Sequence, residues 1–428
     1  MSNAYLLDII IISLATALLS FVAPKIKLPA VVGAILAGLI IGPSFLGLLK
    51  ETVFISEIAQ IGVIFLMFTA GIETDIAAMK KVGKAGFAIA SLGVLAPIIL
   101  GGWVAYLFND SVQDAAMLQN VFVGVVLTAT SVSITVQTLR ELGKLNTDVG
   151  NAILVAAVID DVLGLICITV VSSLVNKTVS VPVVLLKIVA FFALAAVTGK
   201  LAQMLFNKMG KWLDRRTING PFLMVHVLCF CFGMAYVAET YFGVADIIGA
   251  FLAGLVLRTT PLANIIDRYI QPVSVVFLNP IFFANIGLTI NLHYISPTLL
   301  YLSLALVAVA VVSKLIGCGL GAKLCGFSFK KSVQVGCGMI CRGEVGLIAA
   351  NKGMELGLMP SNFMPAVVVV VCATAIITPI LLKIVMPDTA TDMSVHDVAK
   401  WTSNGFRKLP GVLPRAIAVR AFHVHSKL

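Results

Sequence analysis

The stretch GAILAGLII at residues 33–41 recurs as GAFLAGLVL at residues 249–257. A second pair of stretches, FTAGIETDI at 68–76 and FANIGLTIN at 283–291, matches with a one-residue slip. The displacement along the chain from Gly33 to Gly249 equals the displacement from Gly71 to Gly287. One displacement that serves two separate matches indicates an internal duplication. The alternative is that glycine-rich helices look alike because small residues let helices pack closely, which leaves the shared spacing unexplained.

The composition is that of a polytopic membrane protein. Hydrophobic residues make up 60% of the chain and charged residues only 12%. Apolar blocks of about 20 residues, the length that crosses a bilayer, follow one another along the chain. The first block carries Asp8 in place of a basic region and has no small-residue cleavage site before Pro24. We therefore expect a first spanning helix and not a cleaved signal peptide.

The sequence predicts an all-α fold with about thirteen transmembrane helices in residues 1–386. Breaks at Pro, Gly, Asn and charge clusters place the spans near 5–22, 29–46, 53–71, 83–108, 115–140, 147–175, 180–207, 218–241, 243–257, 270–290, 298–324, 330–357 and 361–386. The displacement lays residues 5–175 over residues 218–386 and leaves 180–207 as a linker helix. Six helices and a linker put the second copy upside down, as in the inverted repeats of secondary transporters.

Basic residues are concentrated in alternate loops, which predicts the orientation. With the N-terminus outside, few basic residues fall in external loops, and the cytoplasmic loops hold Lys25, Lys27, Lys80, Lys81, Lys84, Arg140, Lys144, Lys208, Lys211, Arg215, Arg216, Arg258, Arg268, Lys323, Lys330 and Lys331. This asymmetry favours a multi-pass protein of the cell (inner) membrane with a cytoplasmic tail at 387–428. Topology also explains the net charge of +10, so we expect membrane lipids and not nucleic acid as partners.

The fifth and twelfth spans, which the duplication makes counterparts, are both interrupted near their centres. The fifth carries LTATSVSIT at 127–135 and the twelfth carries GCGMICRGEVG at 336–346. Irregular backbone at membrane depth survives only inside protein or beside water, and half-helix ends need charges that compensate their dipoles. Thr130 and Ser131 could support such an unwound stretch, or simply bond back to their own helix. Arg342 and Glu344 are expected to pair with each other or to neutralise a helix end.

Asp160 and Asp161 lie at the centre of the sixth span, about 20 Å of helix from either end. Adjacent positions point about 100° apart, so the two carboxylates face different surroundings. Two acids this close in a low dielectric need cations or a proton, and acids within a membrane usually mark ion or proton pathways. Lys314 is a counter-charge at similar depth, about 13 Å of helix from Lys323.

Further polar residues are expected to have structural roles. Glu73 and Asp75 close the third span, where a helix cap or a place at a funnel mouth fits them best. The eight cysteines lie in apolar segments without the paired spacing of a zinc site and are expected to be inert.

Together these motifs resemble the monovalent cation/proton antiporter superfamily, most closely its NapA-like and Kef-like branch (cation–proton antiporter-2 type). The stretches that carry the resemblance occur in the family's order: FLMFTAGIETDI at 65–76, TATSVSITVQTLRELGKLNT at 128–147, VIDDVLGLI at 158–166, KLIGCGLGAKL at 314–324 and CRGEVGLIAANKG at 341–353. The nucleotide-binding regulatory domain of Kef-like members is expected to be missing, because only the short stretch 387–428 follows the last predicted span.

The resemblance implies a homodimer and an elevator mechanism. A core domain, approximately 83–175 and 298–386, would contain two crossed, broken helices and move against a dimer scaffold formed by the rest. Asp161 would be the shared cation and proton site, and Asp160 would form a salt bridge with Lys314. Thr130 and Ser131 match the unwound stretch beside the site.

We therefore expect a secondary-active Na⁺/H⁺ antiporter that is not an enzyme and needs no cofactor. Na⁺ or Li⁺, or alternatively K⁺, would bind at Asp161 when it is ionised, with Asp160 as a neighbouring metal ligand. A proton lost from Lys314 as well would make the exchange electrogenic. The same repeat plan also serves sodium-coupled symporters of organic anions, and a cation channel would conduct without protons. An intramembrane aspartyl protease fits poorly, because its two acids must come from separate helices.

Overall fold

The chain folds into helices. The computed structural model describes residues 4–26, 28–109, 116–175, 180–213, 220–289, 297–360 and 363–387, so the predicted tail beyond 387 lies outside the described residues. The first helices are α1 (Ala4–Val22), α2 (Ala30–Ile41), α3 (Val53–Glu73), α4 (Ile76–Phe108), α5 (Ala116–Val126), α6 (Val132–Glu141), α7 (Asp148–Val175) and α8 (Val181–Leu213). The others are α9 (Gly220–Phe242), α10 (Asp246–Arg258), α11 (Ala263–Val273), α12 (Asn279–Leu288), α13 (Pro297–Leu324), α14 (Phe329–Gly338), α15 (Glu344–Glu355) and α16 (Met364–Val385).

Many of these helices match the dimensions of a bilayer. Within the described residues, nine helical segments are long and apolar enough to cross a membrane. Helices α2 and α10 are shorter, with 12 and 13 residues. The predicted fifth and twelfth spans are each divided into two half-helices, α5 with α6 and α14 with α15. Within the described residues the observed fold is therefore all-helical, with helices long enough to cross a membrane and two predicted spans that are discontinuous.

Two helices begin well before the predicted starts at 83 and 270. Helix α4 starts at Ile76 because the carboxylate of Asp75 accepts hydrogen bonds from the N–H groups of Ala77 and Ala78, at 2.8 and 3.3 Å. An N-cap of this kind fixes a helix start whatever the hydropathy of the first turn. Helix α11 starts at Ala263 with a polar first part that a hydropathy pattern omits, and a π-helical turn at 274–278 joins it to α12.

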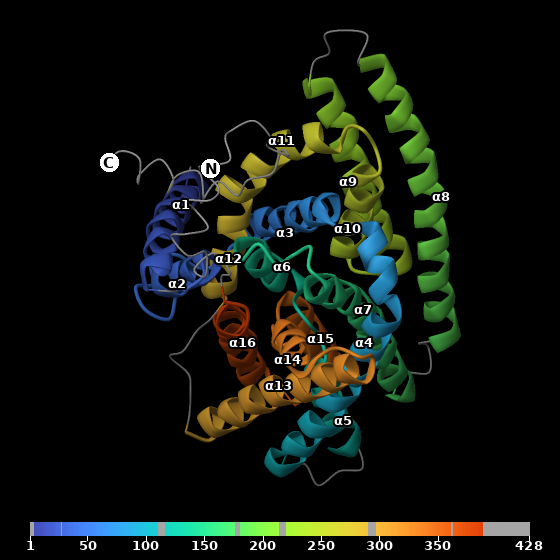
Figure 1. Cartoon of the computed structure of the whole chain (residues 1–428). Helices are drawn as coiled ribbons and strands as arrows, with labels where there is room; N and C mark the ends of the chain where they lie inside the picture. Colours follow the sequence, from blue (N-terminus) through green and yellow to red (C-terminus); the bar gives the residue numbers. More distant parts are fainter. Residues whose placement is uncertain are drawn as a thin grey trace, which may run out of the picture. The chain divides into compact units, whose positions relative to one another are not determined.

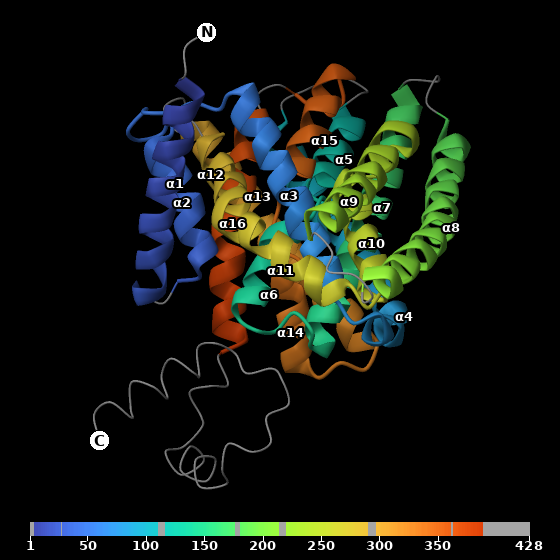
Figure 2. The same ribbon diagram turned by 90° about the horizontal axis from the view of Figure 1, so that it is seen from above.

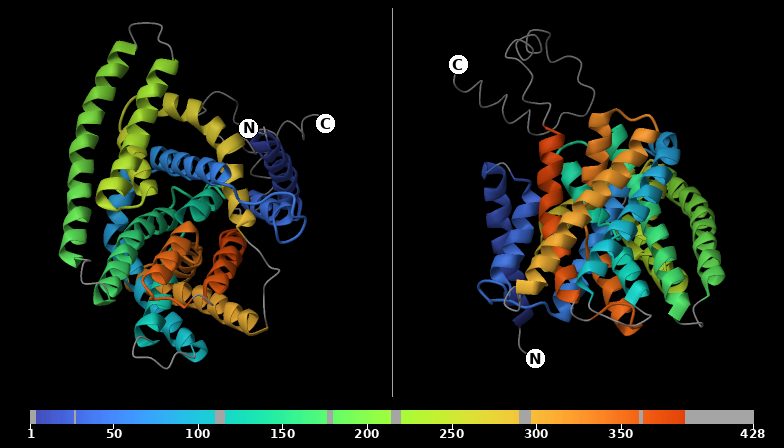
Figure 3. Two further views of the ribbon diagram at one scale, coloured as in Figure 1. Left: turned by 180° about the vertical axis from the view of Figure 1, so that it is seen from behind. Right: turned by 90° about the horizontal axis from the view of Figure 1, so that it is seen from below.

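The helices form two groups (Figure 1). Helices α1–α3 and α8–α12 lie along one side, and α4–α7 and α13–α16 lie along the other. Helix α6 lies next to α3 where the groups meet, and α13 crosses α4 at the far side. The further views place α1 and α2 at the edge opposite α8 (Figures 2 and 3).

Glycines let helices of the first half of the chain pack directly against the backbone of helices of the second half. A Cβ added at Gly38 of α2 would collide with the carbonyl of Ala284 in α12. A Cβ added at Gly254 of α10 would collide with the carbonyl of Phe68 in α3. The displacement that relates Gly33 to Gly249 also relates Gly38 to Gly254 and Phe68 to Ala284. The two contacts are therefore the same contact with the halves exchanged.

The repeated glycines follow the same rule. Gly71 packs on the carbonyl of Phe251, and Gly287 packs on the carbonyl of Ile35. The same displacement relates the two glycines to each other and the two carbonyl residues to each other. Within each half, the glycines that open the repeated motif also pack alike: Gly33 lies on the backbone of Leu19 and Gly249 on that of Met234. The four glycine contacts between the halves therefore follow the one displacement, whereas the partners within the halves, Leu19 and Met234, are offset from it by one residue.

Substitution of Gly38 by alanine is expected to destabilise the protein, because the added methyl group meets backbone that cannot move aside. Overpacking of this kind costs about 1–3 kcal/mol. Gly233 in α9 is the matched control, since an added Cβ there meets nothing within 4 Å. Gly233→Ala should leave stability unchanged or raise it by up to about 1 kcal/mol. Thermal unfolding of the purified protein in detergent compares the two variants, and equal melting temperatures would contradict the prediction.

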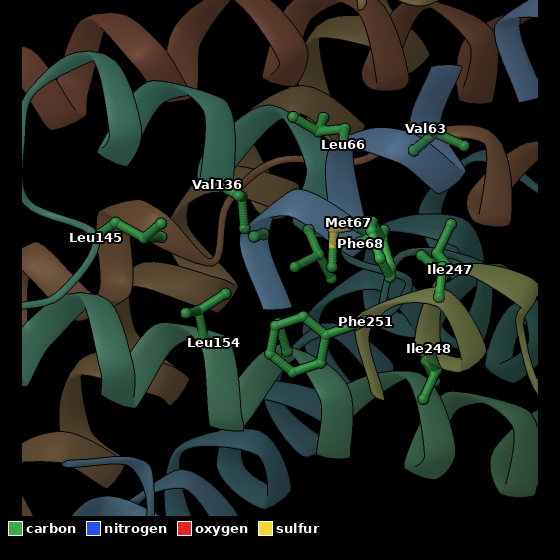
Figure 4. Packing of buried hydrophobic residues seen from close by; sticks show 14 of the residues in the cluster. Val63, Leu66, Met67, Phe68, Val136, Leu145, Leu154, Ile247, Ile248 and Phe251 are labelled. Carbon is green, nitrogen blue, oxygen red and sulfur yellow. The ribbon is translucent and has the colours of Figure 1, made fainter. Parts of the chain in front are cut away.

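The largest buried cluster joins the two groups of helices through apolar side chains (Figure 4). Met67 and Phe68 of α3 lie among Phe251 of α10, Val136 of α6 and Leu154 of α7. All five side chains are nearly or fully buried. Apolar contacts of this kind are non-directional, so this part of the interface does not by itself fix one position of α6 against α3.

Candidate ion site at the helix breaks

The two interrupted spans meet at their breaks. The backbone N–H of Ser131, between α5 and α6, donates to the carbonyl of Cys341, between α14 and α15, at 2.8 Å. The hydroxyl of Thr135 donates to the carbonyl of Gly338, also at 2.8 Å. These bonds satisfy backbone groups that the breaks release, at a depth where an unpaired group is costly.

Close packing holds the breaks together. Gly343 is the residue before α15, and a Cβ there would lie 2.7 Å from the Cβ and Oγ atoms of Ser131. Any side chain at position 343 would push Ser131 aside. The structure therefore brings Thr130 and Ser131 together with the stretch that carries Arg342 and Glu344. The side chain of Glu344 lies outside the described residues, and only its place as the first residue of α15 is given.

Arg342 is fully buried, and its charge faces backbone carbonyls. The guanidinium donates to the carbonyls of Met339 and Ile340, at the C-terminal end of α14, and to Ala310 of α13 at 3.1 Å. The N–H of Arg342 donates to the hydroxyl of Thr374 in α16 at 3.0 Å. A cation at this position compensates the partial negative charge at the end of a half-helix.

Most threonines of the fifth span bond to backbone. Thr128 donates to the carbonyl of Val125 at 2.7 Å, and Thr130 donates to the carbonyl of Thr128 at 3.3 Å. The hydroxyl oxygens of Ser131 and Ser133 are buried and have no hydrogen-bond partner among the described residues. Thr128 and Thr130 thus follow the local bonding expected of such residues, whereas Thr135 bonds across to Gly338 and the two serines differ from both.

Asp160 and Lys314 form a buried ion pair. The Nζ atom of Lys314 lies 2.7 Å from Oδ1 and 2.9 Å from Oδ2 of Asp160, and both side chains are 0% exposed. The pair joins α7 to α13, and Gly93 of α4 covers it. A Cβ at Gly93 would lie 3.7 Å from Lys314 Nζ and 3.8 Å from Asp160 Oδ1. The pairing implied by the family resemblance is therefore present in the structure.

Asp161 has a different environment from its neighbour. Both of its carboxylate oxygens are buried, although the residue as a whole is partly exposed. Lys314 places its ammonium group on the two oxygens of Asp160. Gly164, less than one helical turn from Asp161, lies against Thr128, since a Cβ there would be 3.7 Å from the Thr128 hydroxyl. The acid pair therefore lies beside the break in the fifth span.

Two contributors to this site did not stand out in the sequence. Thr374 supports the backbone of Arg342, and Gly93 lies over the ion pair and leaves room for Cys318, whose Sγ atom would collide with an added Cβ. Neither has a neighbouring motif, because one is a single hydroxyl in an apolar run and the other is one of 35 glycines. The position of Thr374 near the middle of the predicted span 361–386 is the one sequence signal that places it at the depth of the other site residues.

Comparison with known proteins assigns the family. The family profile described as "Sodium/hydrogen exchanger, transmembrane" matches residues 9–387. The Na(+)/H(+)-K(+) antiporter GerN of Bacillus cereus is 36% identical over 90% of this chain and 96% of its own length. The Na(+)/H(+) antiporter of Enterococcus hirae is 33% identical over 87% of this chain and 96% of its own length. A structure of the sodium proton antiporter MjNhaP1 from Methanocaldococcus jannaschii shares the fold, with a TM-score of 0.68, 17% identity, and coverage of 92% of this chain and 100% of that one. The chain therefore belongs to the sodium/hydrogen exchanger family of membrane antiporters.

Proposed function

We propose that the protein exchanges Na⁺ for protons, with Asp161 as the site that both ions share. The observation that carries this proposal is the Asp160–Lys314 ion pair at 0% exposure, next to an acid beside the crossing of two broken helices. Na⁺ binds Asp161 when its carboxylate is ionised, and a proton binds it otherwise. Because the two ions never occupy the site together, competition couples their fluxes in opposite directions.

Lys314 sets the charge moved in each cycle. A cation at Asp161 adds a positive charge near the Lys314 ammonium, and a like charge nearby favours loss of its proton. If the lysine proton leaves with the proton of Asp161, two protons exchange for one Na⁺ and the cycle is electrogenic. Asp160 keeps the lysine in place and supplies a second carboxylate near the cation. Ser131 and Thr130 offer oxygens beside the same position.

An elevator movement of two inverted repeats would carry this site across the membrane. The reciprocal contacts of Gly38 with Ala284 and of Gly254 with Phe68 support the duplication. In this proposal α4–α7 and α13–α16 form the core, and α1–α3 and α8–α12 form a scaffold that dimerises. We infer thirteen membrane crossings in each subunit of the cell membrane, with the N-terminus outside and residues 387–428 in the cytoplasm.

K⁺ is the second candidate for the cation. The name of the Bacillus cereus relative GerN includes K⁺ beside Na⁺. The site described above has carboxylate and hydroxyl oxygens that can bind either ion, because both are hard cations that prefer oxygen ligands. Exchange of K⁺ would leave the roles of Asp161 and Lys314 unchanged.

Proton movement in liposomes that contain the purified protein tests the function. Na⁺, Li⁺ and K⁺ are added in turn, and the internal pH is followed with a fluorescent dye. We expect Na⁺ and Li⁺ to drive proton movement without any organic anion, and an imposed membrane potential to change its rate. A need for an organic anion would identify a symporter, and cation flux without proton movement would identify a channel. Exchange that ignores the potential would contradict the electrogenic cycle alone.

A further inference from the structure

The end of α6 carries two adjacent residues of opposite charge, Arg140 and Glu141, that contact different scaffold helices. Arg140 Nε lies 2.9 Å from Glu73 Oε2, at the last residue of α3. Glu141 Oε2 accepts a hydrogen bond of 2.8 Å from the N–H of Ala30, the first residue of α2. A single core half-helix therefore holds two scaffold helices through its last two residues.

Further hydrogen bonds complete this network. Arg140 donates to the hydroxyl of Thr69 in α3 at 3.1 Å, and Gln271 of α11 donates to Glu73 at 3.4 Å. Gln137, one turn earlier on α6, bonds both Arg140 at 3.4 Å and Glu141 at 3.2 Å. The side chains of Arg140 and Glu73 are 14% and 22% exposed, so their interaction is only partly screened by water.

The charges match the helix ends that they contact. Arg140 lies at the C-terminal end of α3, where carbonyls give a partial negative charge. Glu141 lies at the N-terminal end of α2, where unpaired N–H groups give a partial positive charge. Pro29, at the N-cap position of α2, makes no side-chain cap bond. Glu141 therefore supplies from another element the capping acceptor that α2 lacks locally.

These contacts all lie at one end of the molecule, the end with the predicted cytoplasmic loops. Arg140 and Glu141 supply side-chain hydrogen bonds that connect the two groups of helices there. Near the other end, Gln60 bonds Asp246 at 2.6 Å within the scaffold, and Gln119 bonds the carbonyl of Gly357 at 3.2 Å within the core. Between the ends the interface contains the apolar cluster around Val136 and Phe68 (Figure 4).

We propose that Arg140 and Glu141 form a latch that closes the cytoplasmic side while the ion site faces the opposite side. The apolar interface permits sliding, and the directional contacts of Arg140 with Glu73 and of Glu141 with α2 fix one end position. These contacts must break once in each transport cycle. The latch rests on the proposed elevator movement, and it assigns a gating role to Arg140 and Glu141 of the TLRELGK stretch at 138–144.

Accessibility of Val136 tests the latch. Val136 lies one turn before Arg140 on the same face of α6 and is 0% exposed. The reporter Val136→Cys is placed in a protein whose exposed Cys229 and Cys325 are replaced by serine, and a membrane-impermeant maleimide is added to the cytoplasmic face of vesicles. Arg140→Gln should raise the labelling rate of the introduced thiol by about tenfold, the effect of about 1.4 kcal/mol on the equilibrium. The exchanged pair Glu73→Arg with Arg140→Glu should restore protection.

Two controls make the outcome decisive. Lys331→Gln breaks a 2.8 Å ion pair with Asp148 at the same end but within the core, so it should leave labelling unchanged. Val123→Cys, a second reporter buried inside the core, should stay protected in every variant. Equal labelling with and without Arg140, labelling of both reporters, or failure of the exchanged pair would each overturn the latch. Absence of Na⁺/H⁺ exchange by the unmodified protein would instead reject the proposed function, since labelling requires no transport.

Discussion

Asp161→Asn is expected to abolish Na⁺-driven proton movement in liposomes. The amide keeps the shape of the carboxylate but has no charge for the cation and cannot carry the exchanged proton. A unit charge about 4 Å from a cation contributes about 4 kcal/mol at an effective dielectric constant of 20. Its loss lowers the affinity for Na⁺ by close to a thousandfold. Dye quenching at saturating Na⁺ measures the residual exchange.

Asp148→Asn is the matched control for this result. Asp148 is an acid on the same helix, but its side chain is 73% exposed and it pairs with Lys331 at the surface. Loss of an exposed ion pair costs at most about 1 kcal/mol, so the control should exchange ions at the unmodified rate. Full exchange by Asp161→Asn would remove Asp161 from the site, whatever the control does.

Removal of Lys314 is expected to destabilise the protein more than any surface substitution. Lys314→Gln leaves the Asp160 carboxylate buried without a counter-charge, a loss that costs about 3–5 kcal/mol. Asp160→Asn should cost a similar amount for the complementary reason. The double variant Asp160→Asn with Lys314→Gln places two amides at hydrogen-bonding distance and should recover most of the stability. Thermal unfolding in detergent of the three variants forms the double-mutant cycle.

The double variant also separates structure from transport. With Lys314 absent, only the proton of Asp161 remains to exchange, so the stable double variant should carry one proton for each Na⁺. It should need a higher Na⁺ concentration, because the Asp160 carboxylate near the cation is also absent. Its exchange should then no longer respond to an imposed membrane potential. Additive losses of stability in the double variant would contradict the ion pair, and a persistent response to potential would contradict the role of Lys314 in proton transfer.

Hydropathy and composition were sufficient to predict the main features of the fold. The breaks at 127–131 and 339–343 lie where LTATSVSIT and GCGMICRGEVG predict them, because hydroxyls weaken the helix in the first stretch and glycines weaken it in the second. The sequence predicts the starts of α4 and α11 about two turns later than the structure has them. A hydropathy pattern does not detect a polar first turn, and in α4 the N-cap at Asp75 fixes where the helix starts.

The sequence predicts how deep the site residues lie in the membrane, but not which residues they contact. The position of Asp160 and Lys314 near the middle of their spans follows from counting residues, whereas their pairing came from the family resemblance. Arg342 was expected to neutralise a helix end, but the sequence does not indicate that Ala310 of another helix supplies one of its acceptors. Arg140 looked like one more basic loop residue, because its partner Glu73 is 67 positions away. Such contacts depend on how the helices pack, which no local pattern contains.

The reciprocal glycine contacts also bear on how the chain is made. Helix α2 finds its backbone partner in α12, and α3 finds its partner in α10. The contact residues of the partners are synthesised 246 and 186 residues later, from Gly38 to Ala284 and from Phe68 to Gly254. At usual rates of translation this takes on the order of 10–50 s. During that interval the first half stands in the bilayer with its glycine surfaces exposed to lipid or to other proteins. The contacts between the two halves can therefore form only after the second half has been synthesised.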